Sequence, residues 1–114
     1  MEPERLTPSL RSELSSNDAK LYFSVLSIWE IAIKAARRKP GFNVDAVIVR
    51  NQLLNSRWQE LDFVGAHTAA VRNLPALHND PFDRGLVAQA SVENLQLVTC
   101  DKLLANYGPV VRLI

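Results

Sequence analysis

The sequence predicts an α/β fold whose strands form a mainly parallel sheet. Short apolar runs of strand length alternate with longer segments of helical periodicity, a pattern typical of βαβ units. The chain has 114 residues, of which 47% are hydrophobic and 22% charged, as in ordinary globular proteins. We therefore expect one domain over residues 1–114, long enough to bury a core but too short to form two domains.

Each element follows from apolar spacing and from breaker residues. Thr7 and Pro8 are suited to the N-cap and first position of a helix, whereas Pro40 with Gly41, and later Pro75, end helices. Strands are expected over residues 20–23, 58–61, 95–99 and 110–114. Helices are expected over residues 7–15, 24–36, 44–56, 67–73, 81–94 and 102–106.

Three acids stand where a surface charge is least expected. Glu30 interrupts an apolar helix, Asp83 opens another helix on the side of its apolar residues, and Asp101 directly follows an apolar strand. In parallel sheets, ligands bind beyond the carboxyl ends of the strands. Because no set of Cys or His residues accompanies these acids, they favour a hard-cation site and metal-assisted phosphodiester chemistry.

The helix around Trp29 carries one narrow polar stripe, in which Ser24, Ser27, Glu30 and Lys34 are three or four residues apart. The rest of its circumference is apolar, so we expect it to be buried on most sides, with the stripe facing solvent, a partner or a polar cavity. A capping box of Ser27 with Glu30 would explain the acid structurally, but not if the helix begins near Ser24. An ion pair of Glu30 with Lys34 is also compatible with a site.

The segment from His78 to Arg84 contains two further acids. Asp80 is suited to cap a helix that has Pro81 as its first residue, which fully explains Asp80. Asp83 lies on the same helical face as Leu86, Val87 and Ala90, so we expect a functional role for it.

Asp101 is suited either to a site or to capping the short helix that follows it. Thr99 could orient a water or a metal ligand, although strand propensity explains it equally well.

Other polar groups carry less information. The basic run of Lys34, Arg37, Arg38 and Lys39 is a candidate nucleic-acid patch, but cations at a helix end also complement the helix dipole. We expect Cys100 to be a buried structural thiol. His67 and His78 lack metal-ligand spacing, so both are expected at the surface or at a helix edge.

The net charge of +1 does not indicate a dedicated DNA-binding domain. A single cysteine fits a reducing compartment. The first 20 residues are charged and polar, and no apolar run approaches the roughly 20 residues that span a bilayer, so we expect neither a secretory signal nor a membrane span. We therefore expect a cytoplasmic protein.

Three segments together resemble the PIN-domain ribonucleases, and more narrowly the VapC-type toxins of bacterial toxin–antitoxin pairs. They are Ser-x-x-Ser-x-Trp-Glu-Ile-Ala-Ile-Lys (24–34), His-x-Asp-Pro-Phe-Asp-Arg-x-Leu-Val-Ala-Gln-Ala (78–90) and Leu-Val-Thr-x-Asp (97–101). The resemblance implies a three-layer α/β sandwich around a parallel sheet. It also implies an RNA-cutting site in which Glu30, Asp83 and Asp101 hold Mg²⁺ or Mn²⁺, a homodimer, and a cognate antitoxin protein that blocks the site.

One departure from the family pattern matters. The family opens with a strand that carries a first metal-binding Asp, and the sequence from Met1 onward matches the helix that follows that strand. Either the start has been placed at a downstream Met, or the first strand and its acid are absent. In the second case we expect weaker metal binding, and an open strand edge that pairs with a second chain in an intimate or domain-exchanged dimer.

The function expected is therefore that of a metal-dependent endoribonuclease toxin, with Lys34 and Arg84 as candidates for contacting the RNA backbone. The alternative is an inactive PIN-like remnant that serves as a protein-binding or dimerisation module. A phosphate-accepting receiver domain also uses clustered acids and Mg²⁺. It ranks lower because no pair of acids follows a first strand here.

Overall fold

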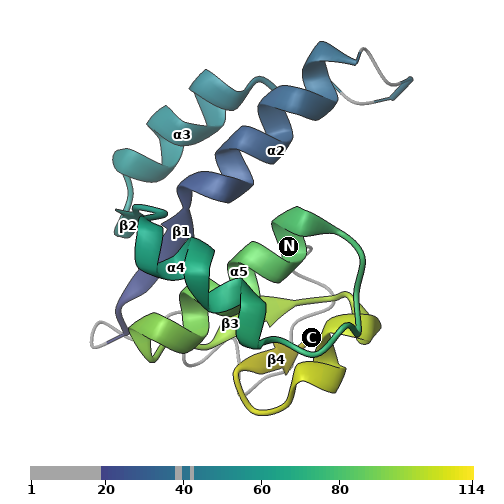
Figure 1. Cartoon of the computed structure of the whole chain (residues 1–114). Coiled ribbons are helices and arrows are strands. Elements are labelled where there is room, and N and C mark those ends of the chain that lie inside the picture. Colours follow the sequence, from purple (N-terminus) through teal and green to yellow (C-terminus); the bar gives the residue numbers. More distant parts are fainter. Residues whose placement is uncertain (1–18, 38–39, 42) are drawn as a thin grey trace. The chain divides into compact units, whose positions relative to one another are not determined.

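The computed structural model describes residues 19–37, 40–41 and 43–114 (Figure 1). The chain divides into two compact units, Lys20–Phe63 and a second unit that contains Val64–Ile114. The helix expected over residues 7–15, and Arg38 and Lys39 of the basic run, lie outside the described residues. None of the described helices is long and apolar enough to cross a membrane.

The Lys20–Phe63 unit has two strands joined by two helices. In chain order its elements are β1 (Leu21–Ser24), α2 (Val25–Ala36), α3 (Ala46–Leu54) and β2 (Trp58–Leu61). Strands β1 and β2 are parallel, with Leu21 opposite Trp58 and Ser24 opposite Leu61. Parallel neighbours need a long crossover, which α2 and α3 supply as they run side by side (Figure 1).

Both helices of this unit begin at a polar N-cap. The Ser24 hydroxyl accepts a hydrogen bond from the Leu26 N–H at 3.1 Å, so α2 begins where β1 ends. This start places Glu30 inside the helix and excludes the capping box of Ser27 with Glu30. The Asp45 carboxylate caps α3 by accepting from the N–H groups of Val47 and Ile48 at 2.8 and 3.2 Å.

An ion pair joins α3 to the neighbouring strand β2. The Arg50 guanidinium donates to both carboxylate oxygens of Glu60, from Nε and, at 3.0 Å, from Nη2. This bidentate contact holds the pKa of Glu60 below its usual value and raises the pKa of Arg50.

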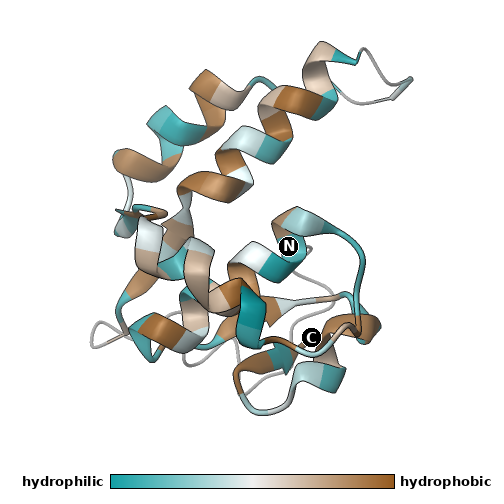
Figure 2. Ribbon diagram, viewed as in Figure 1, coloured by the Kyte–Doolittle hydropathy of each residue, from teal (hydrophilic) through white to brown (hydrophobic). Residues whose placement is uncertain are grey.

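The burial expected for the Trp29 helix is wrong. Leu26 is the only buried residue of α2, and Trp29 is 58% exposed. Helix α3 likewise leaves Val47 and Ile48 exposed, and both helices carry brown, hydrophobic segments along their length in Figure 2. The reason is that α2 packs mainly on α3 within this unit, which leaves other apolar residues of both helices uncovered.

Residues Val64–Ile114 contain the remaining elements that the structure describes. They are α4 (Gly65–Ala70), the 3-10 helix η2 (Val71–Asn73), α5 (Pro81–Glu93), β3 (Leu97–Thr99), the 3-10 helix η3 (Lys102–Tyr107) and β4 (Val111–Leu113). Strands β3 and β4 are parallel, with Leu97 opposite Val111 and Thr99 opposite Leu113. Val87 of α5, Leu104 of η3 and Val111 of β4 form the buried core of these residues.

Helix α5 has the ends that its sequence predicts. The Asp80 carboxylate accepts from the N–H groups of Phe82 and Asp83 at 2.9 and 3.4 Å, and Pro81 is the first helical residue. At the other end Asn94 has φ 56°, the left-handed conformation that closes many helices, and the Leu95 N–H donates to the Ala90 carbonyl at 2.9 Å.

The α/β fold with parallel strands is confirmed. Among the described residues the strands form two separate parallel pairs, β1 with β2 and β3 with β4, one pair in each unit.

Two expectations for single side chains are wrong. Cys100 is exposed, because it lies in the bend that follows the last residue of β3. His67 is buried, with 2% of its surface exposed, and not at the surface. Its burial is possible because Nδ1 accepts the Val64 N–H at 3.0 Å and Nε2 lies 2.9 Å from a Glu93 oxygen, so both polar atoms of the ring have partners.

Candidate metal centre

Asp83 is held in the first turn of α5 because of how that helix begins. Asp80 occupies the N-cap and Pro81 the first helical position, so Asp83 is the third helical residue. Its backbone N–H is the second group capped by Asp80. The carboxylate is about one-fifth exposed, 21% by side-chain surface. Asp83 is therefore partly buried, which agrees with its expected place on the same face of the helix as Leu86, Val87 and Ala90.

Asp101 is held at the end of β3 by three hydrogen bonds. Its backbone N–H donates to the Thr99 hydroxyl at 3.1 Å, and its Oδ1 accepts the Leu103 N–H at 2.9 Å, which caps η3. Oδ2 lies 3.1 Å from His78 Nε2. The capping role of Asp101 is thus realised through Oδ1, and Oδ2 contacts His78. Its membership of a functional site stays a prediction. The Thr99 hydroxyl orients the backbone of Asp101.

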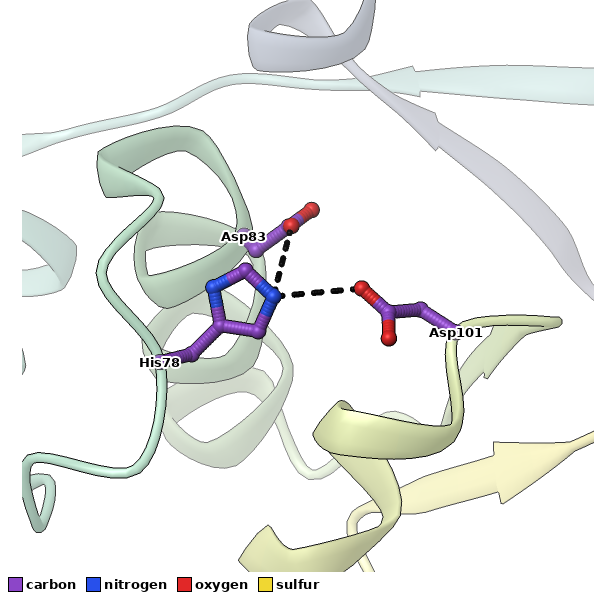
Figure 3. A group of neighbouring side chains, drawn as sticks. All are labelled: His78, Asp83 and Asp101. Atoms are coloured by element: carbon purple, nitrogen blue, oxygen red, sulfur yellow. Dashed lines mark hydrogen bonds and ion pairs between the residues drawn. The ribbon is translucent and has the colours of Figure 1, made fainter.

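His78 brings the two aspartates together. Its Nε2 lies 3.1 Å from Asp101 Oδ2 and 3.4 Å from Asp83 Oδ2 (Figure 3). One donor atom from each of the three residues lies within 4.8 Å of the others. Only 13% of the His78 side chain is exposed.

His78 was expected at the surface or at a helix edge; it lies two residues before the N-cap of α5, but it is largely buried and not at the surface. Its contact with both acids was not expected. The signal that could have revealed it is the spacing His-x-Asp, which places the ring two residues before the N-cap of the helix that carries Asp83.

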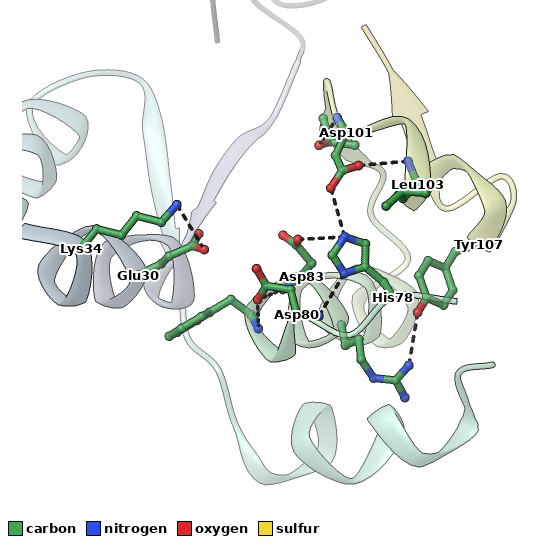
Figure 4. Close-up of polar contacts among 11 residues, drawn as sticks. Glu30, Lys34, His78, Asp80, Asp83, Asp101, Leu103 and Tyr107 are labelled. Atoms are coloured by element: carbon green, nitrogen blue, oxygen red, sulfur yellow. Dashed lines mark hydrogen bonds and ion pairs between the residues drawn. The ribbon is translucent and has the colours of Figure 1, made fainter. Parts of the chain in front are cut away.

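Glu30, the third predicted acid, belongs to the Lys20–Phe63 unit. Its carboxylate forms an ion pair with Lys34 at 3.6 Å, one turn further along α2 (Figure 4). The structural explanation of Glu30 as one member of an i,i+4 pair is therefore realised. The convergence of Glu30 with Asp83 and Asp101 stays a prediction, and so does a contact of Lys34 with RNA.

Arg84 has a structural role in the Val64–Ile114 unit. Its Nη1 donates to the Pro75 carbonyl at 3.1 Å and to the Tyr107 hydroxyl at 3.2 Å, and Nη2 donates to the Val71 carbonyl at 3.4 Å. These bonds attach η2 and the segment after it to α5 and η3. Its predicted contact with RNA stays a prediction.

The donor set of this cluster fits a hard divalent cation. Carboxylate oxygens are the usual protein ligands of Mg²⁺ and Mn²⁺, and separations of at most 4.8 Å are within reach of one hydrated cation. Asp101 uses one lone pair of each oxygen for Leu103 and His78, and each carboxylate oxygen has a second lone pair. Both carboxylates can therefore bind a cation without giving up their hydrogen bonds.

The comparison with protein families covers most of the chain. The family model described as PIN domain matches residues 3–108, a range that includes all three predicted acids and His78. No curated protein matches the chain.

Proposed function

The chain belongs to the PIN-domain family, and from that premise we propose that it is a metal-dependent endoribonuclease of the VapC type, the toxin of a toxin–antitoxin pair. Nuclease activity is the general property of the family, and its members typically depend on a divalent metal. The finer assignment rests on the three sequence segments that resemble VapC-type toxins. A cytoplasmic location is part of the proposal, because the RNA substrate is found there.

The observation that carries the proposal is the meeting of Asp83 and Asp101 at His78 Nε2, at 3.4 and 3.1 Å. Two carboxylates this close together repel each other, and a divalent cation is the counter-charge that such a site suits. Glu30 joins them in the proposal on the strength of the sequence motif. The metal expected is Mg²⁺ or Mn²⁺, held by Glu30, Asp83 and Asp101.

When bound, the metal would activate the attacking water and neutralise charge on the scissile phosphate. The residues of the chain have the task of holding their carboxylates ready. Asp101 is fixed by Thr99 and Leu103, and Asp83 by the capped first turn of α5. Lys34 and Arg84 are the cations proposed to contact the RNA backbone, Arg84 in addition to its bonds within the fold.

The proposed partners are RNA, a cognate antitoxin protein and a second copy of the chain. The dimer is supported by the exposed apolar residues Trp29, Val47 and Ile48 of α2 and α3. Light scattering at micromolar concentration is expected to give twice the mass of one chain. A strictly monomeric species would contradict this part of the proposal.

The test of the proposal is a calorimetric Mn²⁺ titration combined with a cleavage assay on RNA. The wild-type chain is expected to bind Mn²⁺ and to cut RNA in a reaction that EDTA stops. Asp83→Asn and Asp101→Asn keep the shape of the side chain but remove its charge, so both should lose Mn²⁺ binding and cleavage.

The matched control is Glu93→Gln, which removes a carboxylate at the C-terminal end of α5. Glu93 contacts His67 Nε2 in the same way that Asp101 contacts His78 Nε2. The Mn²⁺ affinity and cleavage of this variant should equal those of the wild type. A wild-type chain that neither binds Mn²⁺ nor cuts RNA would contradict the nuclease proposal. That result would favour the alternative, an inactive protein-binding module.

A further inference from the structure

The contact of the His78 ring with the backbone selects one tautomer of the neutral imidazole. The Asp80 N–H donates to His78 Nδ1 at 3.0 Å, so Nδ1 offers a lone pair and carries no proton. In a neutral imidazole the other nitrogen then carries the proton. Nε2–H is therefore the donor in the contact with Asp101 Oδ2 at 3.1 Å, and it also faces Asp83 Oδ2 at 3.4 Å.

A histidine that binds a metal through Nε2 must offer a lone pair on that nitrogen. For His78 the ring proton would then have to move to Nδ1. The resulting Nδ1–H would point at the backbone N–H of Asp80. Two donors would then oppose each other in a place where the ring is largely buried, and the hydrogen bond from Asp80 would be lost. The ring is therefore built to donate to the carboxylates and not to bind the cation.

We propose that His78 is a positioning residue, whose Nε2–H holds the carboxylates of Asp83 and Asp101 in place for the metal without binding it. This inference rests on the proposed function, because it assumes a metal at these two acids. The geometry supports it from both sides of the ring: the Asp80 N–H fixes Nδ1, and the two acids face Nε2 (Figure 3).

The physical benefit of this donor is preorganisation. Before the metal binds, two neighbouring carboxylates would otherwise repel each other and turn apart, and the Nε2–H opposes this by attracting both. The ring lies two residues before the capped start of α5, and the Asp80 N–H donates to it. Groups that hold metal ligands in this manner typically contribute about 10–100-fold to metal affinity.

Two substitutions of His78 separate its two hydrogen bonds. In His78→Asn the short amide can still accept the Asp80 N–H, but it has no donor that reaches the carboxylates. In His78→Gln the longer amide places a donor near the position of Nε2. Calorimetric Mn²⁺ titration is expected to show an affinity about 10–100-fold below wild type for His78→Asn, with recovery in His78→Gln.

His67 provides the matched control. Its ring has the same arrangement, with Nδ1 accepting a backbone N–H and Nε2 facing Glu93. His67→Asn should reduce thermal stability but leave the Mn²⁺ affinity of the folded protein unchanged. Circular dichroism confirms that each variant is folded before it is titrated.

The second readout is the protonation of the ring, measured by nitrogen-15 NMR of His78 with and without saturating Mg²⁺. Nε2 is expected to carry the proton in both states. Loss of the Nε2 proton on adding Mg²⁺, or equal loss of affinity in His78→Asn and His78→Gln, would overturn the positioning role and make His78 a ligand.

The remaining outcomes separate this inference from the proposed function. Wild-type affinity in His78→Asn would overturn the positioning role and leave the metal site intact. A wild-type chain that binds no Mn²⁺ would overturn the proposed function, and the positioning role with it.

Discussion

The Arg84 guanidinium donates a hydrogen bond to the Tyr107 hydroxyl at 3.2 Å, and both side chains also donate to the carbonyl of Pro75, at 3.1 and 3.2 Å. Arg84 lies next to Asp83 in α5, and Tyr107 ends η3, the 3-10 helix that Asp101 caps. The elements that carry the two aspartates are therefore also held together by a polar contact outside the candidate metal centre.

Replacing Arg84 should destabilise the fold. Arg84→Met removes the donor of three hydrogen bonds and leaves the carbonyl of Val71 without this partner, so we expect a loss of about 1.5–3 kcal/mol in the free energy of unfolding. Urea denaturation measures this loss.

Tyr107→Phe should lower the free energy of unfolding by about 1 kcal/mol. The double variant should lower it by less than the sum of the two single variants, because the two residues share one contact. Unchanged stability in Arg84→Met would show that these bonds contribute nothing and would leave RNA contact as its only role.

The structural and the functional role of Glu30 can be tested separately, because one affects stability and the other affects Mn²⁺ affinity. Its ion pair with Lys34 is partly exposed and lies within one helix, so Glu30→Gln should change stability by less than about 0.5 kcal/mol. If Glu30 is a metal ligand, Glu30→Gln should lower Mn²⁺ affinity more than about tenfold. Residues that only position the ligands lower it by about tenfold or more, so a direct ligand should have at least that effect. Lys34→Gln is the control, since it breaks the same ion pair and retains the acid. Equal Mn²⁺ affinity in the two variants would remove Glu30 from the site.

The end of α5 depends on a left-handed residue. Asn94 has φ 56° and ψ 39°, a conformation that costs a residue with a Cβ roughly 1–2 kcal/mol and that glycine adopts freely. Asn94→Gly is therefore expected to leave thermal stability unchanged or raised. Asn94→Ala should have a free energy of unfolding about 1 kcal/mol lower than that of the glycine variant. Equal stability of the two variants in urea would contradict this account of the helix end.

The ion pair of Arg50 with Glu60 makes the stability of the chain depend on pH in the acid range. Because the folded pKa of Glu60 is below its unfolded value of about 4.3, the pair stabilises the fold above that pH. This contribution is lost as the pH falls through the folded pKa. The stability difference between wild type and Glu60→Gln should therefore be constant near neutral pH and shrink below about pH 4. A difference that stays constant down to pH 3 in urea titrations would contradict the lowered pKa.

Local chemistry made most of the elements predictable. Asp80 and Asp101 cap the helices that follow them, as their positions in the sequence allowed, because an N-cap needs only a short polar side chain and the backbone two or three residues on. Ser24 was expected inside the helix that it caps. Strands β1, β3 and β4 were recognisable because each is a short, mainly apolar run, whereas β2 was expected although Gln59 and Glu60 lie within it. Predicted bounds were longer than the observed ones for β3 and β4, where the expected residues 95–99 and 110–114 shorten to Leu97–Thr99 and Val111–Leu113.

Burial was less predictable, because it depends on what covers a residue. The apolar circumference of α2 predicted a buried helix, yet Trp29 is largely exposed. In the other direction, His67 was expected at the surface or at a helix edge. It is buried because Val64 and Glu93, the latter far along the chain, satisfy its ring. Neither partner of that ring is visible in a pattern of apolar and polar residues.

The sequence by itself determined the α/β class and the order and approximate bounds of the elements, and it named Asp83 and Asp101 as candidate site residues. All of these depend on spacing along the chain, which sequence records directly. Only the tertiary structure decided that His78 joins these acids, that Arg84 braces their supporting elements, and that Cys100 is exposed. The reason is physical: His78 and Asp101 are 23 residues apart and meet only because α5 and β3 pack in one unit, so their contact depends on folding and not on local sequence.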